Sequence, residues 1–75
     1  MEVKIGVTGA ARELVLESPL TADELTAAVR AALAEDHGVL VLTDDRGRQV
    51  LVPTEKLAFV EVGEPVERRV GFGAM

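Results

Sequence analysis

The sequence begins with an apolar strand followed by Thr8-Gly9, as many dinucleotide-binding domains do. In such domains glycines let the backbone approach a pyrophosphate at the N-terminus of a helix. The variant found in short-chain dehydrogenases needs further glycines at the positions that Glu13 and Val15 occupy here. Pro19 would also break the helix that must follow. We therefore interpret Lys4–Arg12 as a strand and a turn, not as a phosphate-binding loop.

The other side chains that could do chemistry are paired carboxylates, one histidine and one serine. Asp44-Asp45 falls in an expected hairpin loop, where turn formation and solvation explain it. Glu35-Asp36 precedes His37 at an expected helix end, but adjacent residues on a helix do not face one another, which argues against a metal site. Ser18 precedes a proline and lies far along the chain from the histidine, which argues against a serine hydrolase. We expect no catalytic residue, no metal and no cofactor.

Two pairs of arginines are candidate contacts for a small anionic ligand. Arg46 and Arg48 lie in the expected hairpin loop, and Arg68 and Arg69 lie near the end of the chain, close to Phe72. Arginine and an aromatic ring can together hold a nucleic-acid backbone and stack a base. The formal net charge of −5, from 13 acidic and 8 basic residues, argues against an electrostatic binder of nucleic acid or of anionic membranes.

Composition limits the molecule to one small domain. The chain has 75 residues and no cysteine, so neither a disulfide nor a thiolate metal site can stabilise it. The core of so short a chain contributes about 3–5 kcal/mol at most, and such domains often need a partner. No signal peptide and no apolar run long enough to span a bilayer is visible, so we expect a cytoplasmic protein outside the membrane.

Apolar periodicity and turn signals predict one helix and several strands. Thr21 with Glu24 three residues later makes a capping box, which predicts a helix that runs to about Asp36 and ends at Gly38. Leu33 is expected on its buried stripe. A corner is predicted at 53–56. Strands are predicted at 2–7, 13–17, 39–42, 49–52 and 57–62.

The order β-β-α-β-β-β predicts an α+β fold of two layers, with one helix packed on a four- or five-stranded, mainly antiparallel sheet. We assign residues 1–63 to a single α+β domain and residues 64–75 to a C-terminal tail. The strand order stays open, because the corner at 53–56 could direct the last strand beside the fourth strand or across to the first.

The last three strands are apolar on both sides, whereas the first two have a polar side. Strands of this kind need cover on both faces, and the chain offers one helix. We hypothesise that the second face meets another copy of the chain, most simply in a C2 dimer. The alternative is that the tail covers it. Candidate interface residues are Leu40, Leu42, Leu51, Phe59, Val60, Val62, Val70 and Phe72.

Three stretches of the chain together resemble a known family. MEVKIGV at the start, LTDDRGRQVLVPTEKLAFVEVG in the second half and RRVGFG at the end are similar to DUF3107, a family of small actinobacterial proteins of unknown function. The resemblance covers essentially the whole chain. It implies an intracellular protein and implies no activity or catalytic residue.

These observations predict a non-enzymatic interaction or regulatory module that acts as a dimer or higher homo-oligomer, with an unidentified protein as a further partner. One alternative is a small-ligand or nucleotide-binding protein with its site near the four arginines. A second alternative is a nucleic-acid-associated protein that uses the same arginines.

Overall fold

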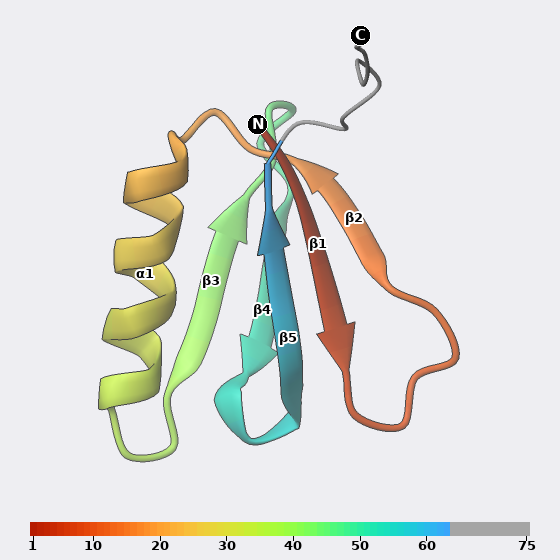
Figure 1. The fold of residues 1–75 in the computed structure, drawn as a ribbon, viewed down its shortest axis with the longest axis vertical. Helices are drawn as coiled ribbons and strands as arrows, with labels where there is room; N and C mark the ends of the chain where they lie inside the picture. Colours follow the sequence, from red (N-terminus) through yellow and green to blue (C-terminus); the bar gives the residue numbers. More distant parts are fainter. Residues whose placement is uncertain (64–75) are drawn as a thin grey trace, which may run out of the picture.

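The computed structural model describes residues 1–63 (Figure 1). The tail, which includes Arg68, Arg69, Val70 and Phe72 from the predictions above, lies outside the described residues. The elements in chain order are β1 (Glu2–Val7), β2 (Leu14–Glu17), α1 (Ala22–Ala34), β3 (Val39–Thr43), β4 (Gln49–Pro53), the short 3-10 helix η1 (Thr54–Lys56) and β5 (Leu57–Val62).

The described strands form two antiparallel sheets, one with the order β2-β1-β5 and one that is the hairpin β3-β4. The α+β fold with one packed helix is confirmed, but two sheets replace the single sheet that we expected. The last strand crosses to β1, which settles the order that the sequence left open. The η1 turn makes this crossing, because Thr54 N donates a hydrogen bond to Gly38 O directly before β3, while Lys56 O accepts one from Thr8 N just after β1.

The helix begins as its sequence predicts. Thr21 Oγ1 accepts a hydrogen bond from Glu24 N at 3.1 Å, and Glu24 Oε1 accepts one from Thr21 N at 2.9 Å. These two bonds complete the capping box and satisfy backbone donors that the first turn of a helix leaves free.

The helix ends at Ala34, earlier than the sequence suggests. The residue with a positive φ beyond it is His37, at 57°, and not Gly38. Gly38 is needed for another reason, since a Cβ there would clash with the backbone oxygen of Ala32. Leu33, expected in the core, is exposed.

The core lies between α1 and the inner faces of the two sheets. The register pairs Ile5 with Val60 and Leu40 with Val52, and residues opposite each other in antiparallel strands share a face. The buried apolar residues are Val3, Ile5, Leu16, Leu25, Ala32, Leu40, Leu42 and Val52.

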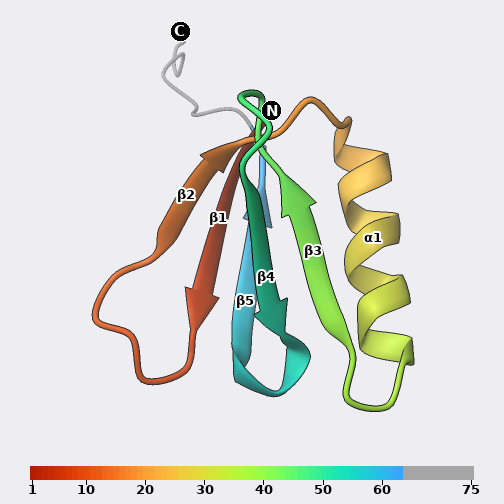
Figure 2. The ribbon, with the colours of Figure 1, turned by 180° about the vertical axis from the view of Figure 1, so that it is seen from behind.

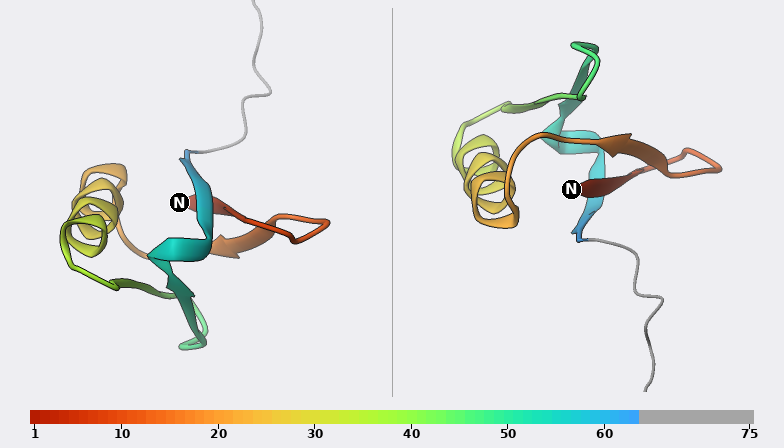
Figure 3. Two further views of the ribbon diagram at one scale, coloured as in Figure 1. Left: turned by 90° about the horizontal axis from the view of Figure 1, so that it is seen from below. Right: turned by 90° about the horizontal axis from the view of Figure 1, so that it is seen from above.

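The helix lies beside β3, and β4 lies behind β5 in the view of Figure 1 and in front of it in Figure 2. Seen along the vertical axis, β5 and the tip of the hairpin lie on opposite sides of the molecule (Figure 3). Among residues 1–63, no helix is long and apolar enough to cross a membrane.

Candidate functional site

The outward face of the hairpin β3-β4 carries apolar side chains that the described chain leaves exposed. Val41 pairs with Leu51 across the two strands, and Val39 pairs with Pro53. The exposed fractions of Val39, Val41 and Leu51 are 46%, 45% and 59%. We call Val39, Val41, Leu51 and Pro53 the hairpin face.

The hairpin face corrects part of the predicted interface. Leu40 and Leu42 are 1% and 2% exposed and belong to the core, on the side of β3 opposite to Val39 and Val41. Leu51, also a predicted interface residue, is exposed and pairs with Val41, not with Leu40 or Leu42. Sequence reasoning missed the two valines because the run VLVL is apolar on both sides and does not show which side faces inward.

On β5, the other predicted interface residues lie on two different faces. Phe59 is exposed on the outer face of the sheet, where its ring covers Gly6 of β1, and a Cβ on that glycine would clash with the ring. Glycine contributes no side chain to its cross-strand pair with Phe59. The aromatic ring fills the space above the glycine and so stabilises the pairing of β1 with β5. Val60 and Val62 face the core and are half-buried.

The loop of the hairpin is held by Asp44. Its Oδ1 accepts hydrogen bonds from Arg46 N at 2.9 Å and Arg48 N at 2.8 Å, and its Oδ2 accepts one from Arg48 Nε at 3.1 Å. Burial of the carboxyl acts to raise the pKa of Asp44, but the backbone hydrogen bonds and the Arg48 charge outweigh it, so the pKa lies below its ordinary value. This carboxylate has a structural role, as its place in a turn predicts.

The two described arginines border an open hollow of about 360 Å³ between β2 and the hairpin loop. Val15 and Leu16 form its apolar wall. Its charged lining residues are Glu17, Asp44, Asp45, Arg46 and Arg48. The hollow is therefore lined by three carboxylates and two guanidinium groups, and one of these guanidinium groups, that of Arg48, already forms an ion pair with Asp44. A phosphate in this hollow would meet more negative charge than positive.

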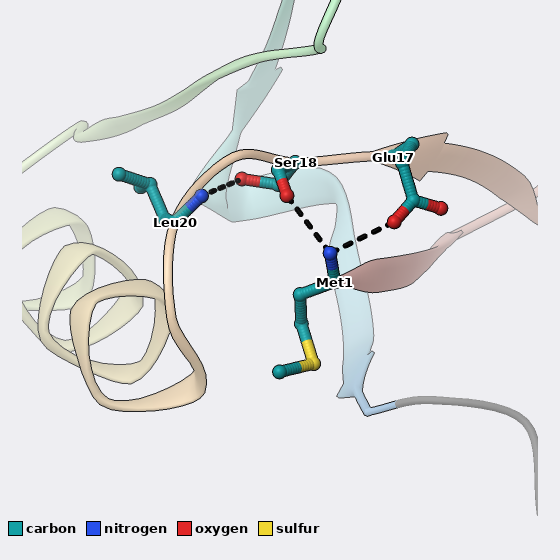
Figure 4. Close-up of polar contacts among 4 residues, drawn as sticks. All are labelled: Met1, Glu17, Ser18 and Leu20. Atoms are coloured by element: carbon teal, nitrogen blue, oxygen red, sulfur yellow. Dashed lines mark hydrogen bonds and ion pairs between the residues drawn. The ribbon is translucent and has the colours of Figure 1, made fainter.

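Ser18 lies in the loop that connects β2 to α1 (Figure 4). It is buried. Its Oγ accepts a hydrogen bond from Leu20 N at 3.1 Å, and its carbonyl oxygen accepts one from the amino group of Met1 at 2.9 Å. The same amino group lies 2.8 Å from Glu17 Oε2. These contacts give the serine a structural role in the connection between β2 and α1.

His37 is exposed beside η1, and its Nδ1 lies 2.7 Å from Glu55 Oε2. Its Nε2 is 3.9 Å from a carboxylate oxygen of Asp36. Within residues 1–63, no group of three histidine, aspartate or glutamate side chains is placed to hold a metal ion. The pair with Glu55 instead joins the loop after α1 to the turn before β5.

Comparison with known proteins identifies the family but gives no activity. No curated protein matches the chain. The family model described as "Protein of unknown function (DUF3107)" matches residues 1–73, which is nearly the whole chain. The resemblance seen in the sequence is confirmed, and the chain belongs to the DUF3107 family.

Proposed function

We propose that this protein is a non-enzymatic interaction module that assembles with further copies of itself, and that the hairpin face is a contact surface. The observation that carries the proposal is the exposure of Val39, Val41 and Leu51 on one side of a two-stranded sheet. Contiguous exposed apolar side chains mark interaction surfaces more often than single ones do. A two-fold axis would place the same face on both sides of the contact.

The size of the hairpin face determines how strong the contact can be. It consists of four residues, Val39, Val41, Leu51 and Pro53. A stable interface takes roughly 20–30 residues and about 800 Å² on each partner. We therefore expect association through the hairpin face alone to be weak and to depend on protein concentration.

Light scattering across a concentration series tests the proposal. The chain has no tryptophan or tyrosine, so its concentration is followed by refractive index. We expect the apparent mass to rise with concentration, and Leu51→Glu to lower it because a carboxylate would be buried in the contact.

The matched control is Gln49→Glu, which adds the same group to the same strand at the polar end, where Gln49 pairs with Thr43. It should leave the mass unchanged. A strict monomer at every concentration, or an unchanged mass in Leu51→Glu, would contradict the proposal.

The ligand and nucleic-acid alternatives have less support. The hollow beside Arg46 and Arg48 holds an excess of carboxylates, and the whole chain is acidic. Binding to the native state raises the melting temperature, so a thermal-shift series with nucleotides would reveal a ligand. We expect no shift.

A further inference from the structure

The strand β5 is an edge strand, and its outward backbone groups can be identified. It lies at the end of the order β2-β1-β5, and no strand among residues 1–63 pairs with its other side. Gly63 N donates a hydrogen bond to Glu2 O of β1 at 3.1 Å. Alternate residues of an antiparallel strand direct their backbone groups to opposite sides. Val60 and Val62 therefore direct their N–H and C=O groups toward the free edge.

Within residues 1–63, this edge has little of the usual protection. Natural edge strands avoid pairing with other chains by carrying charged side chains, above all lysine, by carrying proline or a bulge, or by being covered. The sequence of β5, LAFVEV, contains neither lysine nor proline. Its one irregularity lies opposite the Gly6/Val7 step of β1, so the stretch from Phe59 to Val62 keeps a regular register. Between Phe59 and Val62 the edge is regular and carries one charged residue, Glu61, so its backbone can accept another strand that keeps like charges away from that carboxylate.

The core below this edge is also incompletely covered. Val3 and Ile5 of β1 are fully buried, whereas their partners Val62 and Val60 on β5 are half-buried. A strand added beside β5 would cover the exposed sides of both valines. The hydrophobic effect would then add to the gain from the backbone hydrogen bonds.

Charge and symmetry indicate which strand fits. Lys56 precedes β5 and Glu61 lies near its end. An antiparallel second β5 brings the partner's Lys56 toward the end that carries Glu61, whereas a parallel one would align like charges. A two-fold axis through Val60 joins the two Val60 residues by reciprocal backbone hydrogen bonds. It also places Glu61 opposite the partner's Phe59 and away from the partner's Glu61.

We infer that β5 pairs antiparallel with β5 of a second copy, so that two three-stranded sheets join into one continuous sheet. This inference rests on the proposed self-assembly but uses another surface. The far end of β5 and the tip of the hairpin lie on opposite sides of the molecule (Figure 3), and the hairpin face and β5 belong to different sheets, so the two contacts use separate strands.

Val60→Pro in the full chain tests the inference. The substitution removes the N–H that bonds across the two-fold axis, while the pairing with β1 keeps its hydrogen bonds because this N–H points away from β1. Proline is tolerated at such positions of edge strands. At protein concentrations too low for the weak contact through the hairpin face, we expect the apparent mass of the assembly to halve. Val60→Ala, which keeps the N–H, is the matched control and should keep the assembly.

Amide hydrogen exchange in the unaltered full chain gives a second readout, which holds even if Val60→Pro fails to fold. We expect the amides of Val60 and Val62 to be protected at high protein concentration and to lose protection on dilution. Exchange that is fast at every concentration would overturn the inference. Protection that does not change on dilution would also overturn it, because the edge would then be covered within one chain.

The two proposals fail separately. If Val60→Pro halves the mass while Leu51→Glu has no effect, the hairpin face is wrong and the β5 pairing stands. If Leu51→Glu lowers the mass while Val60→Pro and the exchange at Val60 show no contact, the β5 pairing is wrong.

Discussion

The side chain of Asp44 has a structural role: it binds backbone N–H groups of the hairpin loop. Its carboxylate accepts hydrogen bonds from two backbone N–H groups and one guanidinium within a five-residue stretch of loop. Such bonds favour the charged form, which is why the pKa of Asp44 lies below its ordinary value although burial opposes the shift. The turn-forming role that the sequence indicates for this carboxylate therefore accounts for both of its oxygens.

This assignment predicts a pH dependence of stability. Because the pKa of Asp44 is lower in the folded chain than in the unfolded one, its contribution is complete above the ordinary aspartate pKa of about 3.9. It is lost as the pH falls through the lowered folded value. We expect Asp44→Asn to have a lower melting temperature than the unaltered chain at neutral pH, and the gap to narrow in acid.

Circular dichroism melts between neutral pH and about pH 3 measure this gap. Asp45→Asn, at the neighbouring exposed carboxylate, is the control and should melt like the unaltered chain throughout. A gap for Asp44→Asn that stays constant with pH would show that its charge does not contribute.

At the scale of elements, the helix start offers the cleanest prediction. Thr21 supplies the N-cap oxygen, and Thr26 makes a side-chain hydrogen bond to Ala22 O on the exposed part of the same helix. Thr21→Ala should lower the free energy of unfolding by about 1 kcal/mol, because a backbone donor loses its partner. Urea denaturation measures the change.

Thr26→Ala is the matched control for this element. A threonine that bonds back to the preceding turn does not favour a helix, and alanine has the higher helix propensity. We expect its stability to be equal or slightly higher. Equal losses in the two variants would mean that the cap contributes nothing specific.

The same scale shows what the sequence could predict. Local signals were sufficient for the helix start, the turn at Pro53–Lys56 and the bounds of β5, since each depends on neighbours along the chain. The sequence did not predict the division into two sheets or the inward side of β3. Both depend on contacts between distant segments, such as Thr8 N with Lys56 O. The face of Leu51 became clear only from its register with Val41.

For the candidate site, sequence reasoning identified the apolar strands but not which of their residues are exposed. It selected Leu40 and Leu42, which are buried, and missed Val39 and Val41. A hairpin register counted outward from the loop at 44–48 would have placed Leu51 with Val41. Nothing in the sequence alone could show that Val60 directs its N–H away from β1, because that depends on which strand pairs with β5.

For the whole molecule, the two proposed contact surfaces have a consequence together that neither has alone. A contact that uses the same surface on both copies closes at a dimer. A chain with two such surfaces joins dimers into larger assemblies. We expect the contact through the hairpin face to be the weaker one because it involves few residues, whereas the proposed pairing of β5 would add backbone hydrogen bonds to apolar burial. Assembly should therefore occur in steps as concentration rises.

Combining the two substitutions tests this arrangement. Sedimentation velocity at high concentration should find the unaltered chain larger than a dimer, Leu51→Glu and Val60→Pro each reduced to a dimer, and the double variant a monomer. The control that combines Gln49→Glu with Val60→Ala should keep the larger assembly. Each single variant loses one contact and still forms a dimer through the other. The double variant loses both contacts and should therefore be a monomer. If it has the mass of a single variant, the two surfaces are not independent, and one of them does not contact a second copy.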